Sequence, residues 1–271
     1  MDAQHPWLGL TSFTESTYQY FFGRDEEIQN LFTRVRDNPL TILYGQSGLG
    51  KTSLIGAGLI PKLDVANYRA RLIRLRFGDQ DPSLIRQLKD AFAELLPTNE
   101  ASFNDDLTLW ETLQRQDLRH MLLAKPPVII FDQFEEAFTL GNKGDREGQV
   151  LELMQQIADV VENSPPESLK EKLRTDRKLA REFDFTQSPA RFLITQREDY
   201  LSHLEEYSAV VPSMMRNRMA LHKLTGPQAL QAVVRPGQVA NPNLIDEVVG
   251  TQVVRFVACL LYTSPSPRDR G

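Results

Sequence analysis

The chain has 271 residues, a formal net charge of -5, 41% hydrophobic residues and 25% charged residues. This composition excludes disordered and fibrous proteins, and the acidic balance argues against a dedicated nucleic-acid surface, which usually carries a basic excess. No run reaches the roughly 18 apolar residues of a membrane span, and the N-terminus lacks the features of a signal peptide. We therefore expect a cytoplasmic segment without a membrane anchor and without nucleic acid as a clear partner.

The first predicted elements lead into a glycine-rich turn. Residues 1–22 form a lead-in with aromatic and apolar anchors, and Asp25 is a suitable N-cap for the helix that follows. The apolar side chains Ile28, Leu31, Phe32 and Val35 share one face of this helix. Residues 40–44 then predict a strand, and 53–60 predict a helix after the turn.

The rest of the chain alternates between strands and helices. Strands are predicted at 70–77, 128–132, 191–195 and 219–224, and helices at 82–95, 107–123, 149–161 and 243–258. Such alternation predicts an α/β fold with a doubly wound parallel sheet. The charged residues of 141–189 indicate an elaborated, partly mobile insertion.

The glycine-rich turn matches the Walker A pattern of a P-loop. It consists of Gly45, Gln46, Ser47, Gly48, Leu49, Gly50, Lys51 and Thr52. Glycines let backbone N–H groups surround the phosphates, the lysine reaches the terminal phosphates, and the threonine hydroxyl binds Mg²⁺. We include the next residue, Ser53, among the candidate nucleotide contacts. The motif predicts an ATP or ADP site with Mg²⁺.

Asp132 ends the most apolar predicted strand, as the Walker B carboxylate that binds Mg²⁺ would. A turn aspartate is the structural alternative. Many ATPases place a glutamate directly after this aspartate, but Gln133 stands there. Glu135 and Glu136 follow within one turn, and either is a candidate for orienting the attacking water. The alternative for both is a solvated helix start.

Arg197 follows another predicted strand, and ligands gather at the carboxyl ends of strands in doubly wound sheets. We interpret it as a γ-phosphate sensor, with a salt bridge to Glu198 or Asp199 as the alternative. The cluster Arg216-Asn217-Arg218 fits a solvated basic turn better than an arginine finger.

Four segments together resemble the STAND class of ATPases, specifically the novel STAND group, which is related to AAA+ enzymes. They read FFGRDEEIQNLF, GQSGLGKTS, VIIFDQFEEAF and FLITQREDYLSHL, and the resemblance covers about residues 5–258. It implies a nucleotide switch with C-terminal sensor repeats, in which ATP permits self-assembly. It also places Phe22, Gly23 and Arg24 near the adenine.

The predicted division is a lead-in (1–22), a P-loop NTPase core (23–225), the start of a helical lid or winged-helix region (226–258) and a separate tail (259–271). The tail includes CLLYTSPSPRD. This string resembles a translated sequencing adapter, and a native Ser/Pro-rich linker is the alternative. On the first interpretation the chain is a truncated fragment, Cys259 is not native, and protein partners bind through a missing C-terminal region.

Three functions fit the sequence. The first is a STAND-type signalling ATPase with slow Mg²⁺-dependent hydrolysis. The second is an AAA+-like motor or loader acting on nucleic acid or protein. The third is a nucleotide-binding scaffold without hydrolysis, which Gln133 makes conceivable.

Overall fold

The computed structural model describes residues 6–9, 11–96, 106–141, 148–176, 178–241 and 244–263. The chain divides into two compact units. Unit 1 comprises Met1–Gln29, Thr52–Pro61 and His222–Gly271, and unit 2 comprises Asn30–Lys51 and Lys62–Leu221.

Unit 2 contains a five-stranded sheet in the order β2-β3-β4-β1-β5, with all pairs parallel. The strands are β1 (Leu40–Gly45), β2 (Arg69–Ile73), β3 (Pro127–Phe131), β4 (Arg191–Arg197) and β5 (Arg218–Ala220). The predicted α/β parallel-sheet fold is therefore confirmed. Because β4 lies between β1 and β3, the ends of these three strands are neighbours.

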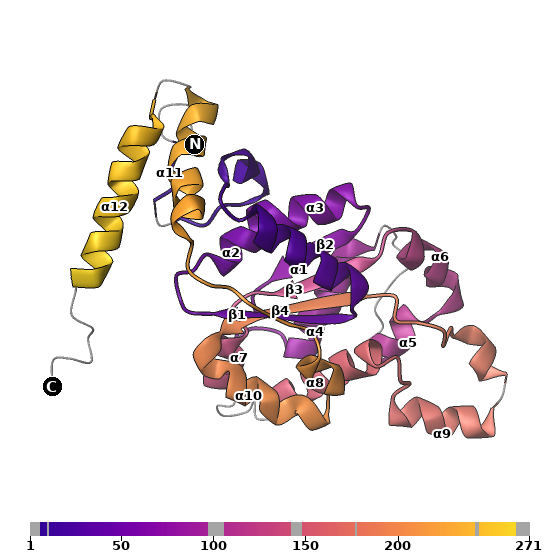
Figure 1. The fold of residues 1–271 in the computed structure, drawn as a ribbon. Coiled ribbons are helices and arrows are strands. Elements are labelled where there is room, and N and C mark those ends of the chain that lie inside the picture. The colour runs from indigo at the N-terminus through magenta and orange to yellow at the C-terminus, as the bar shows by residue number, and fades with distance from the viewer. Residues whose placement is uncertain are drawn as a thin grey trace, which may run out of the picture. The chain divides into compact units, whose positions relative to one another are not determined.

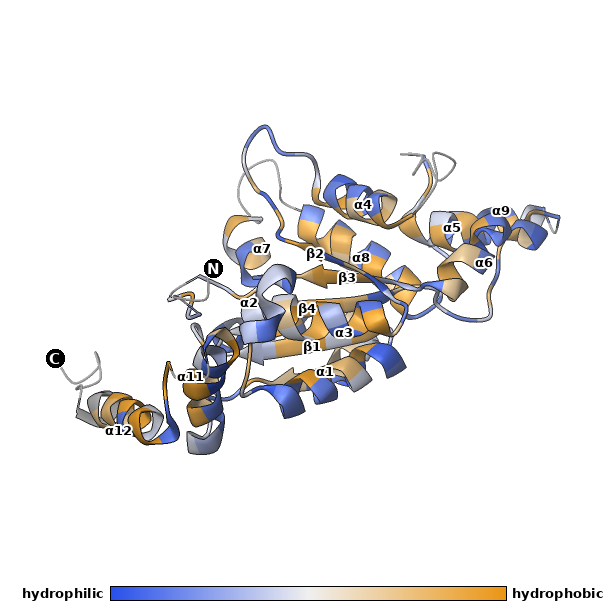
Figure 2. Cartoon of the chain, turned by 90° about the horizontal axis from the view of Figure 1, so that it is seen from above, coloured by the Kyte–Doolittle hydropathy of each residue, from blue (hydrophilic) through white to orange (hydrophobic). Residues whose placement is uncertain are grey.

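The burial of the strands follows their positions in the sheet. β3 is buried along its whole length, as its continuous apolar run predicts, whereas β2 is an edge strand whose arginines are partly exposed. β2 ends at Ile73, not at residue 77, because its partner β3 ends at Phe131, opposite Ile73. Figure 2 shows β1, β3 and β4 as the apolar centre of the sheet.

Helices cover both faces of the sheet in unit 2 (Figure 1). α1 and α3 lie on one face, and α4, α7, α8 and α10 lie on the other. Ile42, Ile129 and Phe192 pack with Leu88 of α4 and Ile157 of α8 in the core. The helix bounds are α1 (Asp25–Asp37), α3 (Ile60–Val65), α4 (Leu84–Leu95), α5 (Leu109–Leu113), α6 (Gln116–Ala124), α7 (Glu135–Leu140), α8 (Gln149–Val161), α9 (Glu167–Thr175) and α10 (Leu201–Glu205). Short 3-10 turns lie at Leu179–Glu182, Glu198–Tyr200, Glu206–Ala209 and Pro212–Met215.

The single helix expected at 107–123 is wrong, because the chain forms α5 and α6 with a break between them. The carbonyl of Gln114 accepts a hydrogen bond from the N–H of Asp184 at 2.8 Å, and Arg115 forms an isolated antiparallel bridge with Phe183. Backbone groups that would continue the helix therefore bind a distant segment. Within the expected insertion, α8 contributes buried side chains to the core, including Val150, Leu153 and Ile157.

Unit 1 contains the lead-in, the segment after the P-loop and the last two helices. Its elements are the 3-10 turn Glu15–Tyr20, the π-helical segment Leu54–Leu59, α11 (Gly226–Ala240) and α12 (Glu247–Thr263). The short α2 (Lys51–Ser53) begins in unit 2. The indole N–H of Trp7 donates to the carbonyl of Val233 at 3.1 Å, so the lead-in contacts α11.

Two expectations on the C-terminal part differ from the structure in their bounds. α12 begins at Glu247 instead of residue 243, and it continues past Ala258 to Thr263. Residues 259–263 contain no proline or glycine, and the first proline of the expected tail is Pro265. Residues 264–271 lie outside the described residues. None of the helices in the described ranges combines the length and apolar character needed to cross a bilayer.

Candidate nucleotide-binding site

The P-loop leaves the sheet at the carboxyl end of β1, where Gly45 is the last strand residue. Gly48 and Gly50 have φ angles of +79° and +88°, a left-handed backbone that glycine adopts without strain. Gln46, Ser47 and Gly48 are exposed, and α2 begins at Lys51. A strand, an open glycine turn and a helix start therefore follow one another as phosphate binding requires.

The ammonium group of Lys51 folds back over this loop. Its Nζ donates to the carbonyl oxygens of Gly45 at 2.8 Å and Gln46 at 3.0 Å. Partial burial lowers the pKa of Lys51 from its ordinary value of 10.5, and the carboxylates of Glu135 and Asp132 oppose this shift. The P-loop cation and both acidic groups are thus electrostatically coupled in unit 2.

Asp132 follows β3 and has a buried carboxylate with defined hydrogen bonds. Its Oδ1 accepts from the hydroxyl of Thr195 at 3.0 Å, and its Oδ2 accepts from Nη2 of Arg74 at 3.0 Å. Neither donor is among the site residues predicted from the sequence. Thr195 directly follows the apolar run Phe192–Ile194 of β4, which is a usable signal, whereas only the register of β2 on β3 reveals Arg74.

Gln133, directly after Asp132, has a φ of 57°. This left-handed conformation is uncommon for a residue with a side chain and costs about 1 kcal/mol. Hydrogen bonds hold it in place, because the N–H of Gln133 donates to the Thr195 hydroxyl at 3.3 Å and the N–H of Phe134 donates to the Thr195 carbonyl at 2.8 Å. The turn after β3 is therefore fixed to β4, and α7 begins directly behind it.

The two candidate glutamates, Glu135 and Glu136, lie in different surroundings. Oε2 of Glu135 accepts from the backbone N–H of Arg197 at 3.2 Å, and its charge acts on Lys51. Glu136 lines a different cavity, together with Leu75, Phe77 and Leu140. Glu135 is thus the glutamate on the P-loop side.

Arg197 lies opposite Gly45 in the pairing of β4 with β1. Its guanidinium forms a salt bridge with Asp199 and lies over the ring of Tyr200, 5.6 Å from the centroid. The pairing with Asp199 was the expected alternative to a phosphate contact. The backbone of Arg197 is at the P-loop edge, while its charged group is bound within its own segment.

The residues that the resemblance places near the adenine lie in unit 1. Phe22 lies under the guanidinium of Arg235, and Gly23 has a φ of +85°, where an added Cβ would be 2.4 Å from the carbonyl oxygen of Gln228. Arg24 is buried; it pairs with Glu27 at 2.7 Å and donates to the carbonyl of His222 at 2.9 Å. These contacts join the residues before α1 to α11 and to His222, which precedes α11.

Thr52 and Ser53 follow Lys51 in α2 and also belong to unit 1. Both are partly exposed, and the Ser53 hydroxyl accepts a hydrogen bond from the N–H of Phe13 at 3.1 Å. Ser53 therefore has a structural contact of its own.

The cluster Arg216-Asn217-Arg218 is not a simple solvated turn. Arg216 is exposed, but Asn217 is buried and donates to the carbonyl of Leu40 and the hydroxyl of Thr41. Arg218 begins β5 and pairs with Glu205 at 2.6 Å. Two of the three residues thus hold β5 in place.

The donors present fit Mg²⁺ better than a softer metal. A buried carboxylate at the end of β3 and a threonine hydroxyl after the P-loop lysine are oxygen ligands, which Mg²⁺ prefers alongside phosphate oxygens. Across the described ranges, no three His, Cys, Asp or Glu side chains gather as a metal site. Within unit 2, Asp132 is the oxygen ligand that would hold Mg²⁺ together with the nucleotide.

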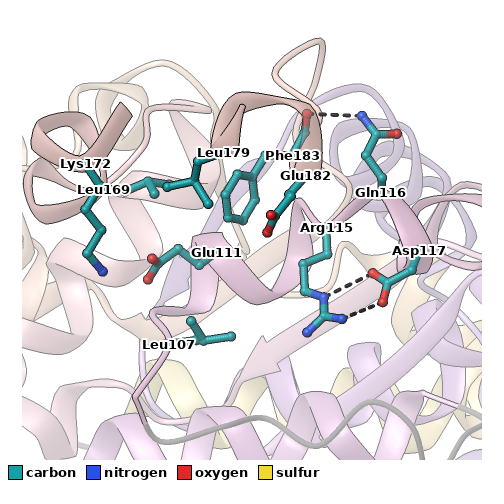
Figure 3. Close-up of a pocket in the computed structure, with 10 residues that line it drawn as sticks. All are labelled: Leu107, Glu111, Arg115, Gln116, Asp117, Leu169, Lys172, Leu179, Glu182 and Phe183. Atoms are coloured by element: carbon teal, nitrogen blue, oxygen red, sulfur yellow. Dashed lines mark hydrogen bonds and ion pairs between the residues drawn. The ribbon is translucent and has the colours of Figure 1, made fainter. Parts of the chain in front are cut away.

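Unit 2 also has a cavity of about 490 Å³ formed by α5, α6, α9 and the 3-10 turn Leu179–Glu182. Figure 3 shows Glu111 and Lys172 on one side of it and the Arg115–Asp117 pair on the other. α6 leads into the start of β3, so this cavity lies towards the amino ends of the strands, away from the P-loop. Its mixed charges do not form a phosphate site.

The parallel sheet, the glycine turn after β1 and the acidic end of β3 define a P-loop nucleoside triphosphatase. The family model described as novel STAND NTPase 1 matches residues 6–257, and the chain belongs to this family. No curated protein matches the chain in sequence.

The chain is similar to several solved structures. A Walker-type ATPase of Pyrococcus abyssi is 19% identical, with a TM-score of 0.56 over 90% of this chain and 65% of that chain. The ORC2 protein of Aeropyrum pernix, in ADPNP and ADP complexes, is 11% identical, with a TM-score of 0.49 over 80% of this chain and 52% of that one. The ORC1 protein of Aeropyrum pernix in complex with DNA is 16% identical, with a TM-score of 0.49 over 89% and 56%. The chain thus spans less than two thirds of each.

Proposed function

We propose that this domain is a nucleotide-dependent switch in signal transduction that binds ATP or ADP with Mg²⁺ and hydrolyses ATP slowly. The observation that carries the proposal is the convergence of charged groups at one edge of the sheet in unit 2. Lys51, Asp132 and Glu135 are electrostatically coupled there, and the backbone of Arg197 lies beside them. Phosphates and a divalent cation require this combination of charges.

Each group has a distinct role in the proposal. The P-loop backbone and Lys51 bind the phosphates, and Asp132 would hold Mg²⁺, which neutralises phosphate charge when bound. Glu135 orients the attacking water, and Arg197 binds the γ-phosphate.

Slow turnover follows from the ion pairs that these groups form within the protein. Arg197 is paired with Asp199, and Arg74 is paired with Asp132, so binding of ATP and Mg²⁺ must exchange protein contacts for nucleotide contacts. Gln133, which stands where many ATPases have a glutamate, cannot accept a proton as a carboxylate would.

The wider role is also part of the proposal. The whole protein would be a cytoplasmic signalling protein that assembles with itself in the ATP state and carries sensor repeats C-terminal to this domain, as the resemblance to the STAND class implies. Protein partners would bind through that further region.

Nucleotide titration tests the proposal. Lys51→Ala should weaken the binding of a fluorescent ADP by about tenfold to a hundredfold, because charge-assisted hydrogen bonds to phosphate are lost. Lys170→Ala, which removes a partly exposed lysine paired with Glu167 on α9, is the matched control. Equal affinity of Lys51→Ala and the parent chain would refute a nucleotide site at this loop.

Phosphate release separates the proposal from its two competitors. A switch gives slow turnover that DNA or an unfolded protein does not stimulate. Brisk, stimulated turnover would indicate a motor, and nucleotide binding without phosphate release would indicate a scaffold.

A further inference from the structure

Arg74 is the first residue after β2, beside the strand that carries Asp132. The register places Ile73 opposite Phe131, and the N–H of Asp132 donates to the carbonyl of Ile73 at 2.9 Å. Arg74 and Asp132, which directly follow these two strands, are therefore neighbours. Nη2 of Arg74 donates a hydrogen bond to Oδ2 of Asp132 at 3.0 Å. The pairing of β2 with β3 thus places the guanidinium of Arg74 beside the carboxylate that is expected to bind Mg²⁺.

Two hydrogen-bond donors to Asp132, Thr195 and Arg74, differ in their exposure to solvent. Thr195 is fully buried in the central strand β4, and its hydroxyl donates a hydrogen bond to Oδ1 of Asp132. The side chain of Arg74 is 51% exposed, whereas that of Asp132 is 3% exposed. Arg74 therefore covers the carboxylate from the solvent side, and its long side chain can turn into water without breaking the core.

A divalent cation that binds Asp132 requires a carboxylate oxygen and cannot share it closely with a guanidinium, since the two positive charges repel each other. We propose that Arg74 competes with the divalent cation for Asp132. Arg74 neutralises Asp132 while metal-free nucleotide is bound, and it must leave before Mg²⁺ binds. This inference rests on the proposed nucleotide site and assigns it a residue that controls its dependence on metal.

Manganese binding tests the inference directly, because Mn²⁺ can replace Mg²⁺ and its electron paramagnetic resonance signal reports binding without any turnover. Mn²⁺ is titrated into the chain saturated with ADP. Arg74→Ala should bind Mn²⁺ about tenfold more tightly than the parent chain, since a competing charge-assisted hydrogen bond is removed. Arg74→Gln, which keeps a polar side chain without charge, should shift the affinity in the same direction.

The same variants should bind a fluorescent ADP more weakly in the presence of EDTA, because Asp132 then loses the compensating charge of Arg74. Arg71→Ala is the matched control: Arg71 lies on the same edge strand, its side chain is 46% exposed, and it pairs with Glu94 of α4. Circular dichroism confirms that each variant is folded.

The outcomes separate the inference from the proposed function. If the parent chain binds ADP, but both Arg74 variants keep its Mn²⁺ affinity or weaken it, the inference is wrong and the nucleotide site remains. If the parent chain binds no ADP with or without metal, the proposed function itself fails.

Discussion

The carboxylate of Glu135 accepts a hydrogen bond from the backbone N–H of Arg197, so the first turn of α7 is attached to the end of β4. The contact fixes the glutamate beside the P-loop lysine, whereas the adjacent Glu136 faces another cavity. Two glutamates that the sequence leaves equivalent are thus distinguished by one backbone contact.

This difference predicts which glutamate acts in hydrolysis. Glu135→Gln should lower phosphate release at saturating Mg-ATP by about a hundredfold, the lower end of what a positioned acid or base contributes, while ADP affinity changes little. Glu136→Gln is the matched control and should retain the turnover of the parent chain. A loss of turnover confined to Glu136→Gln would contradict the assignment.

The salt bridge between Arg197 and Asp199 predicts a second effect. Asp199→Asn releases the guanidinium for the γ-phosphate and should raise the affinity for a non-hydrolysable ATP analogue over ADP by about two- to fivefold, as expected for an exposed ion pair. Competition titrations against a fluorescent nucleotide measure this ratio.

Asp117→Asn is a close control, because Asp117 pairs with Arg115 at the same spacing but on the cavity of Figure 3. It should leave the ATP-to-ADP ratio unchanged. If Asp199→Asn also leaves the ratio unchanged, Arg197 does not sense the γ-phosphate.

Much of the fold follows from local sequence patterns. The apolar runs of β1, β3 and β4 and the glycine turn are specified within a few neighbouring residues, so their positions are predictable. The break between α5 and α6 depends on Asp184, and the partner of Asp132 depends on the register of β2. These contacts join residues far apart in the chain, and sequence periodicity does not encode them.

A third prediction concerns stability and pH. Partial burial raises the pKa of Asp159 on α8 above its ordinary value of 3.8, so the folded protein binds this proton more tightly than the unfolded chain does. The charged form therefore lowers stability above the raised pKa, and this cost disappears below about 3.8. Asp159→Asn should raise the Tm at pH 7 by about 1 to 3 °C, and the gain should shrink as the pH falls.

Thermal unfolding at a series of pH values checks this prediction. Glu152→Gln, at an exposed position of the same helix, should give no comparable gain. A gain for Asp159→Asn that stays constant down to acidic pH would show that a cause other than charge burial is responsible.

The central position of β4 has a consequence for how the domain tolerates change. Thr195 of β4 binds Asp132, and Arg197 of the same strand lies opposite the first glycine of the P-loop. A shift of this strand by one residue would misplace the proposed Mg²⁺ ligand and the P-loop at once, although β4 contains neither Walker motif. A change that shifts β4 would therefore disrupt both parts of the site together. Recombination with a related domain should succeed only where the exchanged segment carries β1, β3 and β4 together.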